Sequence, residues 1–239
     1  MRSERQGLLA LLLVTMVWGT TFPAMKMLSA HLDALQIIWL RFAIALAVLS
    51  PLWRGMRRAE QRWGLLLGAL LFLAFWLQIE GLARTSSNRN AFVTGLNVLV
   101  VPLLAMAALG RRYGWTLWAA CGMALAGMAL MFHENEPWNL GDTLTLASTL
   151  FYAVYILTLE ECARRTAAAP LRATRMAAMQ ALVMFGAATV LVGVRHGGYA
   201  GSLAQIAQLT DGAWIAVAYL GVVASVLVVT LQAWGQQRV

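Results

Sequence analysis

Hydrophobic residues occur along the chain in long runs separated by short polar segments. A helix rises about 1.5 Å per residue and needs about 20 residues to cross a hydrocarbon core of about 30 Å, so each run is long enough to span a membrane. The pattern predicts an all-α polytopic membrane protein with eight transmembrane helices. The runs cover residues 7–29, 33–53, 63–83, 87–109, 113–132, 141–160, 173–194 and 211–233.

Composition agrees with this class, since 61% of the residues are hydrophobic and only 12% are charged, against about 25% charged in soluble domains. The 18 Lys and Arg residues fall mainly on alternate connections. Because cytoplasmic loops are enriched in Lys and Arg, we expect a multi-pass protein of the inner (plasma) membrane with both termini cytoplasmic. The cytoplasmic side then holds Arg2, Arg5, Arg54, Arg57, Arg58, Arg62, Arg111, Arg112, Arg164, Arg165, Arg172, Arg175 and Arg238, whereas the external loops hold Arg84, Arg89 and Arg195.

Despite the formal net charge of +8, the basic residues do not form one patch, and we expect no nucleic-acid partner. The partners expected are the lipid bilayer and a small-molecule substrate. Cys121 and Cys162 are two lone thiols without metal-ligand spacing, and we interpret them as inert small residues.

A short internal match relates the third and eighth runs. Residues 77–84 and 231–238 both read L-Q-x-x-G-x-x-R. Five predicted spans separate the copies, and an odd number of crossings reverses direction, which indicates an inverted-topology repeat. The alternative is a coincidence in an apolar chain of low complexity. The repeat predicts two units, residues 1–132 with five helices and residues 133–239 with three.

Several motifs are similar to those of a known family. Their order resembles the EamA family of the drug/metabolite transporter superfamily over essentially the whole chain. The motifs are residues 17–23 (VWGTTFP), Arg41-Phe42, residues 91–96 (AFVTGL) and 100–104 (VVPLL), Gly141-Asp142, and residues 219–225 (YLGVVAS) leading to 231–235 (LQAWG).

The resemblance implies ten helices in two inverted five-helix repeats, a central substrate cavity, and transport by alternating access. This chain departs from the family pattern because its second unit is truncated to three helices. Two hypotheses follow. The chain is a secondary transporter of a small polar or amphipathic metabolite, such as an amino acid or a carboxylate, or it is a truncated, non-transporting membrane protein or subunit. In the second case a partner chain, or a homo-oligomer, would complete the bundle.

Three charged side chains lie inside the predicted spans. A charge at a helix centre costs roughly 2.5–3.5 kcal/mol on insertion scales, so Lys26, Arg41 and Glu80 are candidates for function. Arg41 is the deepest, about 12 Å into its span by the helical rise. Arg41 and Glu80 are placed to form an ion pair or a coupling site. Alternatively, Lys26 and Glu80 extend to the membrane interface.

Uncharged polar residues form stripes on two predicted helices. Asn90, Thr94 and Asn97 share one face, and Thr145, Ser148, Tyr152 and Tyr155 share another. Such faces either line a wet cavity or bond neighbouring helices. Gln78 and Gln232 occupy equivalent repeat positions. The cavity candidates are therefore Trp18, Arg41, Gln78, Asn90, Thr94, Asn97, Tyr152, Tyr155 and Gln232.

Catalytic interpretations find little support in the sequence. His31, His133 and His196 are far apart and lack metal-ligand spacing, and no phosphate-binding loop or nucleophile elbow is present. We expect no enzyme activity, cofactor or metal. The two cations and one acid in the predicted outer half suggest an attraction for anions.

Overall fold

Every regular element in the described residues is helical. The computed structural model describes residues 2–131, 137–228 and 231. The elements are α1 (Arg2–Leu28), α2 (Ala34–Leu49), the 3-10 turn η1 (Ser50–Trp53), α3 (Arg58–Arg84), α4 (Ser87–Gly95), α5 (Asn97–Leu109), α6 (Trp115–Met131), α7 (Leu140–Arg165), α8 (Ala173–Arg195), α9 (Ala200–Ala207), α10 (Asp211–Ala218) and the π-helix η2 (Tyr219–Leu227).

Several of these helices, alone or joined to the next element, are long and apolar enough to cross a bilayer. Six candidate spans lie within the described residues, and the pair formed by α9 and the continuous α10–η2 segment, bent by 110°, makes a seventh if counted as one span. The helix at Trp115–Leu130 is apolar but shorter. The all-α polytopic class is therefore confirmed, while the number of eight crossings stays a prediction.

Two details differ from the sequence interpretation. The run at 87–109 was expected as one helix, but Leu96 separates α4 from α5. The Leu96 N–H bonds the carbonyl of Val93, which tightens the turn after Gly95, a poor helix former. The second difference is α9, a short helix in a connection for which no helix was predicted.

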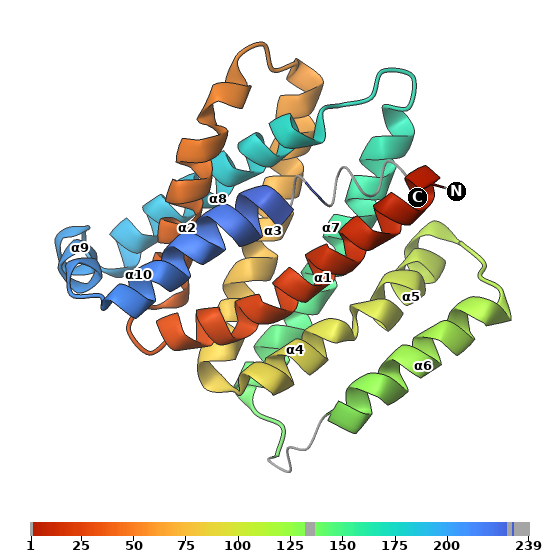
Figure 1. Cartoon of the computed structure of the whole chain (residues 1–239), viewed down its shortest axis with the longest axis horizontal. Coiled ribbons are helices and arrows are strands. Elements are labelled where there is room, and N and C mark those ends of the chain that lie inside the picture. Colours follow the sequence, from red (N-terminus) through yellow and green to blue (C-terminus); the bar gives the residue numbers. More distant parts are fainter. Residues whose placement is uncertain (1, 132–136, 229–230, 232–239) are drawn as a thin grey trace.

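Helix α3 lies at the centre of the molecule, packed against α7 and α8 (Figure 1). Small residues permit this close approach. A Cβ at Gly64 would lie 2.6 Å from the Met179 Cβ, and one at Gly68 would lie 2.8 Å from the Val183 Cβ. Helix pairs in membranes commonly pack through such small residues, because lipid provides no hydrophobic drive for association.

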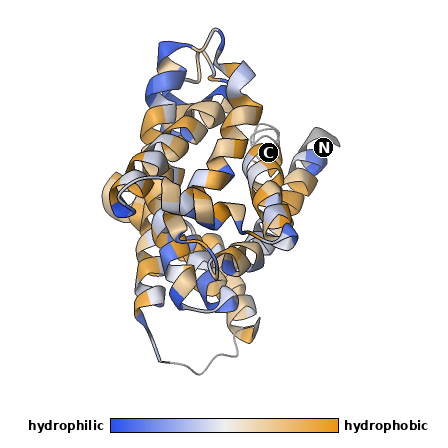
Figure 2. Cartoon of the chain, turned by 90° about the vertical axis from the view of Figure 1, so that its left-hand side faces the viewer, coloured by the Kyte–Doolittle hydropathy of each residue, from blue (hydrophilic) through white to orange (hydrophobic). Residues whose placement is uncertain are grey.

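The outward faces of the helices are apolar. Leu9, Met16, Met123, Leu130 and Val194 are all more than 60% exposed. Figure 2 shows hydrophobic colour along the helices and hydrophilic colour mainly near their ends. This surface fits lipid as the surrounding solvent, since a soluble monomer rarely exposes such continuous apolar area.

Candidate functional site

The deepest predicted charge, Arg41, lies inside the bundle on α2. That helix begins with a capping box in which the Asp33 Oδ1 accepts from the Gln36 N–H at 2.9 Å and the Gln36 Oε1 accepts from the Asp33 N–H at 2.9 Å. Arg41 follows two turns later and is only 3% exposed. Its Nε donates to the Ser225 Oγ at 2.6 Å, which connects α2 to η2.

Ser225 occupies an unusual backbone segment. Its Oγ donates to the carbonyl of Leu220, five residues earlier, at 2.8 Å. Gly221 allows η2 to lie directly on α2, because a Cβ there would be 2.8 Å from the Ile44 Cβ. π-Helical segments are rare and occur frequently at functional sites.

The other neighbours of the Arg41 guanidinium are uncharged. Its Cζ lies 4.6 Å from the ring centroid of Phe75 and 5.5 Å from that of Phe42. Its Nη1 lies 3.9 Å from the Met25 sulfur. A desolvated cation–π contact is worth up to about 2 kcal/mol, whereas burying an ion costs several kcal/mol. These contacts therefore offset only part of the cost of burying the charge.

A series of aromatic contacts and hydrogen bonds continues from Arg41 across the bundle. The Phe75 ring lies 5.8 Å from the Tyr152 ring of α7, centroid to centroid. The Tyr152 hydroxyl donates to the Gln78 Oε1 at 3.2 Å, and the Gln78 Nε2 donates to the Thr94 Oγ1 of α4 at 3.1 Å. We call the group Arg41, Phe75, Gln78, Thr94, Tyr152 and Ser225 the central chain.

Asn90 adjoins the central chain through the backbone of α3. Its Nδ2 donates to the Gln78 carbonyl at 3.1 Å and to the Thr145 Oγ1 at 2.6 Å. Its Oδ1 is buried and has no hydrogen-bond partner among the described residues, as is also true of the Asn97 Oδ1. A buried polar atom left unpaired costs about 1–3 kcal/mol, so these two oxygens are free acceptors for a ligand or water.

Besides Asn90, three predicted cavity residues in the described part of the molecule are not members of the central chain. The Tyr155 hydroxyl donates instead to the Gln180 Oε1 of α8 at 3.2 Å. The Trp18 side chain is 42% exposed, and none of the contacts of the central chain includes it. Asn97 begins α5, beyond the break after α4. Gln232 lies outside the described residues.

Two members of the central chain were not predicted as site residues. Ser225 ends the YLGVVAS motif, but the sequence shows no more of its role than a hydroxyl within a strongly apolar run. Phe75 is one of many aromatic residues in its span, and nothing in the sequence distinguishes it from a lipid-facing ring. Its role depends on residues of both α2 and α7 contacting the same ring.

The predicted ion pair between Arg41 and Glu80 does not form, and that expectation was wrong. The Glu80 carboxylate pairs with Arg84 at 2.6 Å and with Arg195 at 2.8 Å. Arg41 is bonded to Ser225 instead. Sequence spacing placed both residues in the same half of the bundle but could not give the direction in which each side chain points.

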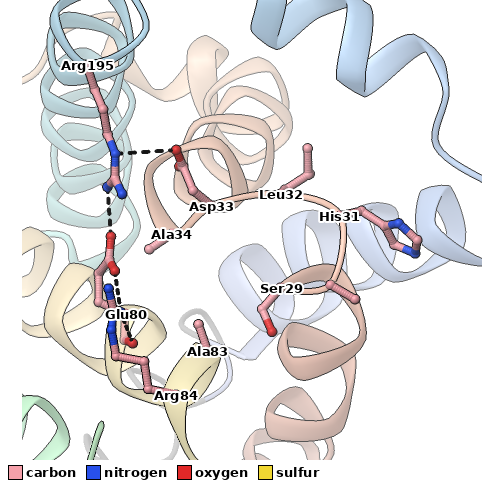
Figure 3. A pocket seen from close by; sticks show the side chains of 10 residues that line it. Ser29, His31, Leu32, Asp33, Ala34, Glu80, Ala83, Arg84 and Arg195 are labelled. Carbon is pink, nitrogen blue, oxygen red and sulfur yellow. Dashed lines mark hydrogen bonds and ion pairs between the residues drawn. The ribbon is translucent and has the colours of Figure 1, made fainter. Parts of the chain in front are cut away.

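Glu80 belongs to a cluster at one end of the bundle, which we call the Glu80 cluster: Asp33, Glu80, Arg84, Arg195 and His196. Arg195 lies 3.7 Å from the Asp33 carboxylate, and the His196 Nε2 lies 2.7 Å from it. The cluster borders an open hollow of about 470 Å³ formed by the α1–α2 connection and the ends of α3 and α8. In Figure 3, Arg195 bridges Asp33 and Glu80.

A second cluster, the Glu60 cluster, lies at the other end of α3. The fully buried Glu60 accepts from the backbone N–H of Arg57 at 2.8 Å and of Arg172 at 3.1 Å, and Arg175 lies 3.5 Å away. The helical rise between Glu60 and Glu80 amounts to about 30 Å, which matches the thickness of a hydrocarbon core. The spacing of the two clusters is therefore the one expected for groups at the two surfaces of a membrane.

Lys26 has a structural position at the Glu80 end. Its Nζ donates to the carbonyls of Leu82 at 2.8 Å and Thr85 at 2.7 Å, at the end of α3. A cation there compensates the partial negative charge of the helix C-terminus. Nearby, Arg89 and Asp142 form a buried ion pair at 2.8 Å that connects α4 to α7.

Comparison with known proteins agrees with this arrangement. Residues 5–133 match the model of the EamA-like transporter family. An Archaeoglobus fulgidus protein named as an uncharacterized transporter is 27% identical over 157 residues, which is 65% of this chain and 49% of that protein. The chain thus spans about half the length of this relative. Because the family model covers more than half of the sequence, and the structure is a bundle of apolar helices, the chain belongs to the EamA-like transporter family.

Proposed function

We propose that the chain is a secondary transporter that moves a small polar or amphipathic metabolite, such as an amino acid or a carboxylate, by alternating access. The observation that supports this most is the central chain. Polar and aromatic side chains from α2, α3, α4, α7 and η2 meet inside an apolar bundle. Polar groups at such a position are costly in a membrane and typically mark a solute pathway.

The two ion clusters support the alternating-access part of the proposal. The Glu60 cluster joins α3 to α8 at one surface, and the Glu80 cluster joins α2, α3 and α8 at the other. A pathway that opens to one side at a time needs contacts that separate at one surface while the other stays closed. In the Glu80 cluster, the Arg84 and Arg195 side chains are 43% and 44% exposed, which suits this role because water replaces exposed ion pairs at small cost.

The arrangement in the membrane is also part of the proposal. We propose an inner-membrane protein with both termini in the cytoplasm, supported by the arginine-rich connections. We further propose that residues 1–132 form the first repeat and that residues 133–239 belong to the second one. The match of the family model to residues 5–133 supports the first boundary.

The direct test is solute flux into lipid vesicles containing the purified chain. We expect at least one radiolabelled amino acid or carboxylate from a broad panel to enter faster than into empty vesicles. Gln78→Leu removes two hydrogen bonds of the central chain, each worth about 1 kcal/mol, and we expect the flux to fall about tenfold or more. Tyr199→Phe is a matched control, because Tyr199 lies outside the central chain and stacks on Trp39.

If no solute in the panel enters faster than into empty vesicles, the alternative is favoured. The chain would then be a membrane protein that does not transport alone, or a subunit that works with a partner chain.

A further inference from the structure

The other buried charged side chains of the molecule have oppositely charged neighbours, and Arg41 differs from them in this respect. Glu60 has Arg57 and Arg175, and Arg89 has Asp142. Among the described residues, no Asp or Glu carboxylate lies within ion-pair distance of Arg41, although its side chain is 3% exposed. A buried charge is normally paired, so the guanidinium lacks an anion that the described residues do not supply.

The nitrogen atoms of the Arg41 guanidinium differ in the strength of their hydrogen-bond partners. Nε is bonded to the Ser225 hydroxyl, and the face of the group lies over the Phe75 ring. Among the described residues, the hydrogen-bond contact of Nη1 is with the Met25 sulfur, which is a weak acceptor at 3.9 Å. Two parallel N–H groups at the end of an arginine match the two oxygens of a carboxylate. Met25 has a flexible side chain that can move away from this edge.

The surroundings favour a carboxylate over a more highly charged anion. Lys26, the one lysine of the sequence, is held by the carbonyls at the end of α3. Arg41 therefore supplies a single positive charge, which balances one negative charge. The rings of Phe42 and Phe75, packed edge to face at 5.9 Å between centroids, suit an apolar group attached to that carboxylate.

We propose that the Arg41 guanidinium binds the carboxylate of the transported solute, with the Ser225 hydroxyl fixing the orientation of the guanidinium and Phe42 and Phe75 facing the apolar part of the solute. The inference rests on the proposed function and deepens it, since it assigns the substrate class and the residue that recognises it. The solute enters as the missing counter-ion and displaces the Met25 sulfur.

The first test measures binding of radiolabelled benzoate to the purified full chain by equilibrium dialysis, with benzamide as the uncharged analogue. We expect benzoate, or another carboxylate from a displacement panel of acetate, succinate and glutamate, to bind at least tenfold more tightly than its amide. Arg41→Gln should abolish this preference, and Arg41→Lys should retain part of it. Arg62→Gln removes the same charge from an exposed position and should leave the preference unchanged.

Three outcomes of this test overturn the inference. They are equal binding of acids and amides by the unaltered chain, a preference for acids that survives Arg41→Gln, and inorganic phosphate displacing the acids as strongly as they displace each other. The last outcome would assign the site to oxyanions in general.

A second test does not depend on the choice of ligand. Met25→Cys, made with Cys121→Ser and Cys162→Ser, places a thiol beside the Nη1 edge. We expect a negatively charged methanethiosulfonate to modify this thiol at least tenfold faster than a positively charged one of similar size. The ratio should reverse with Arg41→Gln. Faster modification by the cationic reagent while Arg41 is present would overturn the inference.

The two proposals fail in distinguishable ways. Flux of neutral or cationic solutes that carboxylates do not inhibit and Arg41→Gln does not alter would leave the transporter proposal standing and overturn the role of Arg41. Carboxylate binding that depends on Arg41, with no flux of any solute, would support the binding site and contradict the transporter proposal.

Discussion

Gly81 of α3 and Gly141 of α7 lie in direct backbone contact. A Cβ at Gly81 would lie 2.7 Å from the Gly141 carbonyl oxygen and 2.5 Å from the Thr145 Oγ1, and a Cβ at Gly141 would lie 2.8 Å from the Gly81 carbonyl oxygen. This crossing holds α3 and α7 together one turn from Gln78, so it also sets the distance across which Tyr152 reaches α3.

We predict that Gly81→Ala destabilises the protein. Alanine favours a helix by about 1 kcal/mol over glycine, but forcing an extra carbon into a packed contact costs about 1–3 kcal/mol or more. Because both neighbouring oxygens belong to the rigid start of α7, we expect the packing cost to prevail. Thermal unfolding of the purified protein in detergent measures the change.

The matched control is Gly122→Ala in α6, where a Cβ would meet no atom within 4 Å. At this position the substitution changes only the helix propensity, which is higher for alanine than for glycine, so we expect unchanged or raised stability. Equal melting temperatures for the two variants would contradict the close crossing of α3 and α7.

We predict that Glu60→Ala lowers stability by about 3 kcal/mol, the usual loss when one partner of a buried ion pair is removed. The change leaves the backbone N–H groups of Arg57 and Arg172 without their acceptor and removes the carboxylate from Arg175, whose guanidinium keeps the carbonyls of Arg54 and Gly55. Chemical unfolding of the purified protein provides the measurement.

Glu160→Ala is the control for this prediction. Glu160 pairs with Arg111 on the surface, and its hydrogen bond raises the pKa of the Arg111 guanidinium above the ordinary value. Its side chain is half exposed, and we expect little change in stability. A loss as large as that of Glu60→Ala would show that the Glu60 cluster is no stronger than a surface pair.

Cys121 completes a hydrogen bond that Pro102 removes. Proline has no N–H, so the carbonyl of Val98 lacks its usual helical donor, and the Cys121 thiol of α6 donates to that carbonyl at 3.3 Å. We predict that Cys121→Ala costs about 1 kcal/mol or more, whereas Cys121→Ser, which keeps a donor, costs less. Unfolding midpoints of the variants measure the difference.

A double-mutant cycle separates this bond from ordinary packing. Pro102→Ala restores a backbone donor to the Val98 carbonyl, so the cost of Cys121→Ala should shrink in that background. An unchanged cost would show that the thiol only fills space.

The predicted orientation in the membrane has a labelling test. In a background with Cys121→Ser and Cys162→Ser, Gln208→Cys and Ala168→Cys each place one thiol in an exposed connection at opposite ends of α8. We expect a membrane-impermeant maleimide to label the first variant in intact cells and the second only after permeabilisation. The reverse pattern would invert the proposed topology.

Part of the candidate site was predictable because helical periodicity is a local property. The stripe at Asn90 and Thr94, the Tyr152 position and the burial of Arg41 follow from spacing and from the cost of a charge in lipid. Asn97 shows the limit of this reasoning, since the i, i+7 relation assumes an unbroken helix and Leu96 interrupts it.

The sequence by itself determined that the chain is a polytopic helical membrane protein, because lipid requires every backbone polar group to be satisfied within a long apolar segment. It also marked Arg41 as a residue to explain. Only the tertiary structure decided the partners. Arg41 meets Ser225, and Glu80 meets Arg195, because the packing of α2, α3, α8 and η2 fixes the direction of each side chain. Those contacts join residues more than one hundred positions apart, and no local pattern encodes them.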